Sequence, residues 1–204
     1  MVYQRLMEQA AASRALPMSV PNVLTYVRIA AVPALVACLF FLKGDAARWS
    51  AFSLFVFAGI TDWLDGYLAR AWEQQSTLGR MLDPIADKLL VGAVLMMLVH
   101  DNTIGGWSIW AAIIILCREI LVSGLREFLA ELNVKIHVTQ LAKWKTTMQM
   151  VAIGFLICGP AGDRILPYVS YIGLLLLWVS ALLTLYTGYD YFRAGFRHLM
   201  SEDA

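Results

Sequence analysis

The residues of this sequence best suited to chemistry are four aspartates in two pairs. Asp62 and Asp65 are three residues apart, and Asp83 and Asp87 are four residues apart. At 3.6 residues per turn, each pair lies on one face of a helix. Residues 71–78 between the pairs are mostly polar and predict a turn. Because a short turn joins antiparallel neighbours, we expect the two acidic faces to meet.

Four carboxylates inside apolar helices need compensating positive charge. One carboxylate at bilayer depth costs about 2.5–3.5 kcal/mol, and like charges nearby add repulsion. The neighbouring Arg70, Arg80 and Lys88 supply at most three positive charges. Two Mg²⁺ ions supply four, prefer carboxylate oxygens and keep positions open for phosphate. The cluster therefore predicts a paired Mg²⁺ site, with Mn²⁺ as the alternative ion, suited to in-line displacement at phosphorus.

Single members of the set also have structural interpretations. Asp83 before Pro84 is typical of a helix N-cap followed by proline at the first helical position. Asp62 or Asp65 alone would also suit a salt bridge to Arg70. Neither role excludes metal binding, and two same-face pairs favour a functional set.

The elements that must position these residues are six apolar segments. Hydrophobic residues make up 60% of the 204 residues and charged residues only 15%, which excludes a typical soluble enzyme. The net charge of +1 gives no indication of nucleic-acid binding. We expect one all-α integral membrane domain, residues 1–204, with six transmembrane helices. Their expected ranges are 23–42, 49–71, 85–100, 107–129, 141–159 and 168–192.

The basic residues predict the orientation of these spans. Of the 16 Lys and Arg residues, only Lys43, Arg48 and Arg164 fall on the side opposite the termini, so both termini should be cytoplasmic. Residues 1–17 suit either an amphipathic helix on the membrane surface or a frayed tail. Small residues in several spans permit packing within one chain or between two, so a homodimer stays an open alternative.

The acidic segment resembles the signature of the CDP-alcohol phosphotransferase family. The resemblance implies a six-span fold and a reaction in which an acceptor hydroxyl attacks the β-phosphorus of a CDP-linked lipid or alcohol, releasing CMP. The matching positions, all at the family's spacing, are Asp62, Asp65, Gly66, Ala69, Arg70, Gly79, Asp83 and Asp87.

The resemblance also implies a role for each matching residue. Asp62, Asp65 and Asp83 would be metal ligands. Asp87 would be a fourth ligand or the catalytic base that takes the proton of the acceptor. The positions that would line the CDP site are Gly66, Ala69, Arg70 and Gly79.

Three polar residues at the start of the first span add to this site. Asn22, Thr25 and Arg28 are three apart and share one helix face. They are similar to a stretch near the amino terminus of family members, and Asn22 and Thr25 are expected to reach the nucleotide or a metal-bound phosphate. The alternative is helix capping by Asn22 and a snorkelling Arg28.

A second, basic set indicates the acceptor. Arg118 lies inside the fourth span and needs a buried partner, while Glu119 is expected to face elsewhere. We expect Arg118, Arg126, Lys143 and Lys145 to bind an acceptor phosphate. The alternative pairs Arg118 with a cluster aspartate and the lysines with anionic headgroups.

The segments 118–127 and 142–146 resemble the bacterial branch of the family that uses CDP-diacylglycerol as donor and sn-glycerol 3-phosphate as acceptor. This branch would work in the bacterial inner membrane with the site facing the cytoplasm. By charge alone, inositol phosphate or phosphatidylglycerol would fit as well, and serine would fit poorly. A divalent-cation transporter is a further alternative, but it would place its charge near the midplane.

Overall fold

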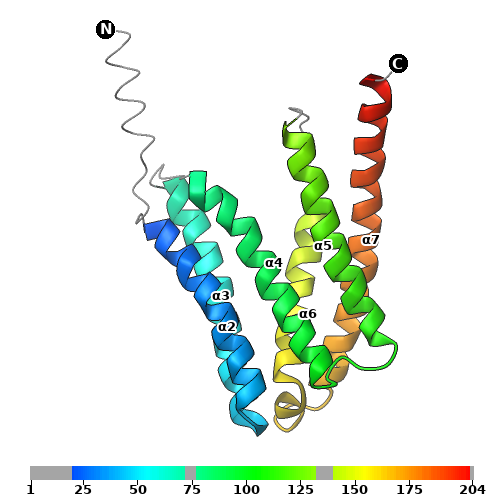
Figure 1. Ribbon diagram of the computed structural model, residues 1–204. Helices are drawn as coiled ribbons and strands as arrows, with labels where there is room; N and C mark the ends of the chain where they lie inside the picture. Colours follow the sequence, from blue (N-terminus) through cyan, green and yellow to red (C-terminus); the bar gives the residue numbers. More distant parts are fainter. Residues whose placement is uncertain (1–19, 72–76, 132–139, 203–204) are drawn as a thin grey trace.

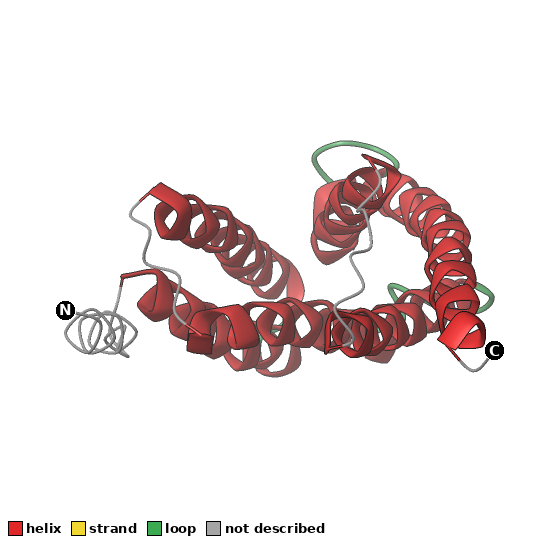
Figure 2. Ribbon diagram, turned by 90° about the horizontal axis from the view of Figure 1, so that it is seen from above, coloured by secondary structure: helices red, strands yellow, loops and turns green. Residues whose placement is uncertain are grey.

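The computed structural model describes residues 20–71, 77–131 and 140–202, which form six helices and no strand (Figures 1 and 2). The number and order of the helices confirm the all-helical prediction. The predicted surface helix at 1–17 lies outside the described residues. The helices are α2 (Val20–Phe41), α3 (Gly44–Ala71), α4 (Thr77–His100), α5 (Ser108–Glu131), α6 (Gln140–Asp163) and α7 (Val169–Glu202).

Consecutive helices run in opposite directions (Figure 1). As a result, α2, α4 and α6 begin at the same end of the molecule at which α3, α5 and α7 finish. We call this end the site end, and the opposite end the far end. The closest packing joins α6 to α7, α2 to α3, α5 to α7, α2 to α4 and α3 to α6.

The acidic helices α3 and α4 are not one of the closely packed pairs in the described part of the chain. The prediction that the turn between them makes them direct neighbours is therefore wrong. Each packs against α2 instead, because α2 supplies a surface to both. The two acidic faces consequently meet through the side chains of α2.

The start of α4 differs from its predicted position. This helix begins at Thr77, eight residues before the predicted start at 85, so Asp83 lies inside the helix and is not its N-cap. Pro84 also lies inside. Proline removes a single helical hydrogen bond, the one that its N–H would donate four residues back, and α4 continues through it. Both acidic pairs therefore project from continuous helix.

The outer surface of the bundle is apolar. In the part of the chain that the structure describes, three helical stretches have the length and composition of a membrane span: Asn22–Phe41, Ser108–Leu129 and Val169–Tyr189. Large apolar side chains are exposed on every helix, and examples are Phe41, Phe57, Met96, Ile120, Val151 and Leu182. Leaving such a side chain in water forgoes about 1.5–3 kcal/mol of burial energy. This surface suits lipid, which supports the prediction of a membrane protein.

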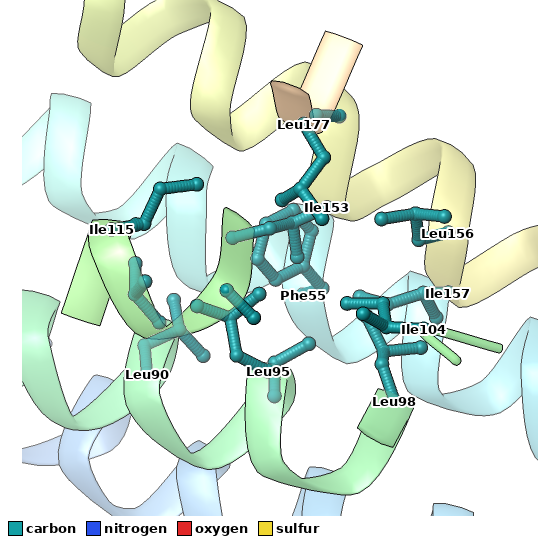
Figure 3. Packing of buried hydrophobic residues seen from close by; sticks show 14 of the residues in the cluster. Phe55, Leu90, Leu95, Leu98, Ile104, Ile115, Ile153, Leu156, Ile157 and Leu177 are labelled. Atoms are coloured by element: carbon teal, nitrogen blue, oxygen red, sulfur yellow. The ribbon is translucent and has the colours of Figure 1, made fainter. Parts of the chain in front are cut away.

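A core of buried apolar side chains fixes the helices relative to one another. Phe55 of α3 packs with side chains of α4, α5, α6 and α7 (Figure 3). The core residues labelled there include Leu90, Leu95, Ile115, Ile153 and Leu177, all of which are nearly inaccessible to solvent. Because interiors are densely packed, this core holds the polar side chains of the site end at fixed relative positions.

An arginine ties the helices together at the far end. The backbone of α6 is non-helical at Gly159 (φ 40°, ψ −125°), which disturbs the hydrogen bonds of the preceding carbonyls. The Arg48 guanidinium of α3 donates to two of these carbonyls, those of Leu156 and Ile157, at 3.3 and 3.4 Å. Its other terminal nitrogen lies 2.8 Å from a carboxylate oxygen of Asp101. Arg48 is thus structural.

Gly173 provides a test of the packing between α6 and α7. A Cβ at this position would lie 2.9 Å from both Cγ and Cδ2 of Leu156 and 3.2 Å from its backbone nitrogen. We expect Gly173→Ala to lower the free energy of unfolding by about 1–3 kcal/mol. Thermal unfolding in detergent measures this. The control is Gly124→Ala, where a Cβ meets nothing within 4 Å; equal melting temperatures for the two variants would contradict the packing.

Candidate active site

A cavity of about 490 Å³ with charged side chains on its wall opens between the helices toward the site end. It joins the acidic set and the basic set that the sequence indicated separately. Asp62 of α3 and Asp87 of α4 lie on its wall together with Arg118, Arg126 and Lys145. The other charged and hydroxyl-bearing residues of the wall are Arg28, Lys88, Glu119, Ser123, Thr146 and Thr147.

Arg28 of α2 is the centre of the acidic cluster. Its NH1 nitrogen lies 2.5 Å from Oδ1 of Asp62 and 3.1 Å from Oδ1 of Asp87. Its NH2 nitrogen donates to Oδ2 of Asp65. One guanidinium therefore links both aspartates of α3 to an aspartate of α4. The fourth acid, Asp83, accepts a hydrogen bond of 2.9 Å from the Thr25 hydroxyl.

The exposed fractions of these side chains separate their roles. Arg28 is 0% exposed and Asp65 5%, whereas Asp62 is 47% and Asp87 55% exposed. Asp65 and Arg28 thus form the floor of the cluster. Asp62 and Asp87 present carboxylate oxygens to the cavity, where a water-soluble molecule reaches them.

The polar face predicted for the first span is confirmed. Asn22, Thr25 and Arg28 are all buried, and two of them contact the cluster aspartates. The alternative of a snorkelling Arg28 is wrong, because the guanidinium is fully buried. Among the described side chains, one guanidinium offsets the four carboxylates of the cluster only in part, so a negative charge is left there.

The arrangement of the acids fits a guanidinium more closely than a metal ion. Within the described residues, no three Asp, Glu, His or Cys side chains are grouped as a metal site, since Arg28 stands among three of the four acids. The donor set nevertheless consists of carboxylate oxygens, the ligands that Mg²⁺ prefers. Its residual negative charge also calls for cations. The residues therefore fit Mg²⁺ by their chemistry when the Arg28 guanidinium moves away from the carboxylates.

The basic set is held by α7 and by one glutamate. Arg118 donates from Nε to the carbonyl of Thr184 at 3.1 Å and from NH2 to the Thr187 hydroxyl at 3.1 Å. Glu119 accepts from Arg118 NH1 at 3.2 Å and from Lys145 Nζ at 2.7 Å. The expectation that Glu119 faces elsewhere is wrong, because a long side chain reaches round the helix. The proposed pairing of Arg118 with a cluster aspartate is not among these contacts.

Lys88 does not neutralise the neighbouring Asp87. Its ammonium group donates to the hydroxyl of Ser123 on α5 and lies 3.8 Å from a carboxylate oxygen of Glu127. Among the described residues, Arg28 is the cation that contacts Asp87. Lys88 thus joins α4 to α5 along the wall of the cavity.

The remaining predicted residues are placed only in part. Gly66 follows Asp65 in α3, and Gly79 is buried near the start of α4. The side chains of Ala69, Arg70 and Lys143 lie outside the described part of the structure, although their backbone belongs to α3 and α6. Their predicted roles stay predictions.

Sequence reasoning missed Glu119 as a partner of both cations and overlooked Thr184 and Thr187. A signal for the threonines exists in the sequence. They are three apart in an otherwise apolar segment, so they share a helix face. Both are buried and meet Arg118.

Comparison with known proteins places the chain in a family. A sequence profile of the family described as CDP-alcohol phosphatidyltransferase matches residues 18–186. A protein of Rickettsia bellii is 46% identical over 176 residues, which cover 86% of this chain and 94% of that protein. A protein of Cereibacter sphaeroides is 38% identical, and the match covers 90% of this chain and 98% of that protein. A protein of Haemophilus influenzae is 40% identical, and the match covers 85% of this chain and 91% of that protein. All three are named CDP-diacylglycerol–glycerol-3-phosphate 3-phosphatidyltransferase.

Proposed function

Because this chain belongs to the CDP-alcohol phosphatidyltransferase family, we propose that it transfers the phosphatidyl group of CDP-diacylglycerol to sn-glycerol 3-phosphate. The products are CMP and phosphatidylglycerophosphate. The observation that carries the proposal is the single cavity that joins an acidic cluster to a cationic set. The first set suits a metal-bound pyrophosphate, and the second suits the phosphate of an acceptor.

The acidic cluster is the proposed donor site. Asp62, Asp65, Asp83 and Asp87 would hold two Mg²⁺ ions, or Mn²⁺ in their place. The bound ions would neutralise the pyrophosphate and the charge that develops on the CMP leaving group. The proposed nucleotide-binding residues are Asn22, Thr25, Gly66, Ala69, Arg70 and Gly79.

Asp87 is the proposed catalytic base. Its half-exposed carboxylate faces the cavity that also contains the cationic set, so it lies on the side from which the acceptor arrives. The acceptor hydroxyl oxygen forms a bond to the β-phosphorus, and the bond from that phosphorus to the oxygen of CMP breaks. The hydroxyl proton passes to Asp87.

The cationic set is the proposed acceptor site. Arg118 and Lys145 are fixed by hydrogen bonds to α7 and to Glu119, so their geometry is set before the acceptor binds. Arg126 lies on the wall of the same cavity, and Lys143 precedes Lys145 by two residues. A dianionic phosphate is the ligand that such preorganised cations favour.

The proposed topology places the site at the cytoplasmic face of the bacterial inner membrane. Each of the six helices would cross the bilayer, with both termini cytoplasmic, as the distribution of Lys and Arg supports. Water-soluble glycerol 3-phosphate would then enter from the cytoplasm, while the acyl chains of the donor stay in the lipid around the bundle.

An acceptor panel tests the proposed function. Purified protein with CDP-diacylglycerol and Mg²⁺ should release CMP with glycerol 3-phosphate. It should release CMP at least about tenfold more slowly with serine, which has no phosphate, since a lost charged hydrogen bond costs at least this factor. Inositol phosphate and phosphatidylglycerol keep a phosphate, so the panel measures the preference between them and glycerol 3-phosphate directly. Thorough chelation should abolish the release. Preference for another acceptor would overturn the proposal that glycerol 3-phosphate is the acceptor but would leave the proposed type of reaction standing. Metal uptake into vesicles without CMP release would instead favour a transporter.

A further inference from the structure

We infer that Arg28 is an internal cation that occupies the acidic cluster in the metal-free protein and is displaced from its carboxylates when a divalent ion binds. The inference deepens the proposed function, because it rests on the metal site proposed there. It concerns a residue that contacts the cluster aspartates of both α3 and α4.

The first argument is competition for the same oxygens. The Arg28 guanidinium contacts Oδ1 of Asp62, Oδ2 of Asp65 and Oδ1 of Asp87. A Mg²⁺ ion needs carboxylate oxygens at about 2.0–2.1 Å. An ion bound between Asp62 and Asp87 would therefore occupy the position that NH1 now holds between them. The guanidinium and a divalent ion are both cations, so they cannot both occupy the position between these two oxygens.

The second argument is the charge of the metal-free cluster. Without Arg28, four carboxylates from two helices would face one another with no cation among the contacts described. Like charges at this spacing oppose ionisation and drive the helices apart. The guanidinium keeps α2, α3 and α4 together until divalent ions supply a larger compensating charge.

The third argument concerns the two sides of the cluster. Arg28 is fully buried and approaches from the floor, whereas Asp62 and Asp87 are about half exposed to the cavity. An ion thus arrives from the open side without having to pass the arginine. The Nε of Arg28 is buried with no hydrogen-bond partner in the described structure. The side chain is therefore held through its two terminal nitrogens, without a hydrogen bond from Nε.

A permanent structural tie is the competing explanation. Arg48 at the far end illustrates it, because this guanidinium binds Asp101 and two backbone carbonyls outside the cavity. The two explanations differ in one measurable quantity. Removal of a competing cation strengthens metal binding, whereas removal of a tie leaves metal binding unchanged or weaker.

Mn²⁺ binding in the absence of substrates tests the inference. Titration of the detergent-solubilised protein, followed by the loss of the electron paramagnetic resonance signal of free Mn²⁺, gives the dissociation constant. For Arg28→Gln we expect it to fall by at least about tenfold, because the cluster loses both a competitor and a positive charge. The melting temperature without metal should fall, and its rise on addition of Mn²⁺ should exceed that of the wild type.

Two further variants make the result decisive. Arg48→Gln removes a carboxylate-bound arginine at the far end and should leave Mn²⁺ affinity unchanged. Arg28→Lys serves if Arg28→Gln does not fold. Its ammonium group has one nitrogen, whereas the guanidinium contacts the three carboxylates through two, so it should hold them less well. Mn²⁺ should therefore still bind several-fold more tightly than in the wild type. If the wild type binds no Mn²⁺, the proposed metal site fails and the inference with it. If the wild type binds Mn²⁺ and neither Arg28 variant binds it more tightly, the inference alone is overturned.

Discussion

Asp87→Asn is expected to reduce the turnover number by about 10³-fold while CDP-diacylglycerol still binds. A positioned general base contributes roughly 10²–10⁴ to the rate, and asparagine keeps the shape of the side chain without accepting a proton. The carboxylate faces the cavity, and one of its oxygens is bound by Arg28. CMP release under saturating substrates gives the turnover number, and equilibrium binding of labelled donor gives its affinity.

The matched control is Asp163→Asn at the far end of α6. Asp163 accepts hydrogen bonds from the backbone and the hydroxyl of Ser170 and does not line the cavity, so its turnover number should stay at the wild-type value. Normal turnover in Asp87→Asn would show that another group takes the proton. Loss of donor binding together with turnover would show that Asp87 acts chiefly as a ligand of the metal.

The existence of the helices follows from the sequence more reliably than their ends. Apolar segments separated by polar or glycine-containing links predict six helices, and six are described. The start of α4 was predicted too late because Asp83 and Pro84 form a pattern typical of a helix N-terminus. The residues from Thr77 onward are nevertheless helical. A local signal for a helix start does not exclude continuation when the preceding residues are helical too.

The aspartates could be predicted because their spacing is local. Two pairs on two helix faces follow from 3.6 residues per turn alone. The partner of three of them could not be predicted in this way, because Arg28 lies 37 residues from Asp65 and 59 from Asp87. Its role depends on α2 packing against both acidic helices, a tertiary fact with no counterpart in local spacing.

Glu119 shows the same limit within one helix. Adjacent residues point about 100° apart on a helix, which predicts that Arg118 and Glu119 face different neighbours. Both side chains are long, however, and Lys145 of α6 attracts the carboxylate at 2.7 Å. The third partner, supplied by another helix, decides where the glutamate points. The direction of the Cα–Cβ bond alone therefore underestimates how far a long charged side chain can reach.

Lys145→Met should lower kcat/KM for glycerol 3-phosphate by about 100-fold, mainly through a higher KM. The ammonium group is buried, binds Glu119 at 2.7 Å and Thr184 at 3.3 Å, and lines the cavity. Truncating one member of a buried, hydrogen-bonded charge pair costs roughly 2–5 kcal/mol, or some 30- to 5,000-fold. Methionine fills a similar volume, so the loss reports the charge. Steady-state CMP release at varied acceptor concentration separates KM from kcat.

Two comparisons decide whether this loss belongs to the acceptor phosphate. Lys43→Met removes an exposed lysine at the far end and should leave all constants unchanged. Glycerol has the hydroxyl groups but no phosphate. It should react slowly and equally with the wild type and with Lys145→Met, because it carries no charge that Lys145 could bind. A KM for glycerol 3-phosphate that does not rise in Lys145→Met, or an equal loss with glycerol, would mean that Lys145 supports the fold of the cavity without binding the acceptor. A rise confined to glycerol 3-phosphate would place its phosphate beside Lys145, with its reacting hydroxyl directed along the same cavity toward Asp87.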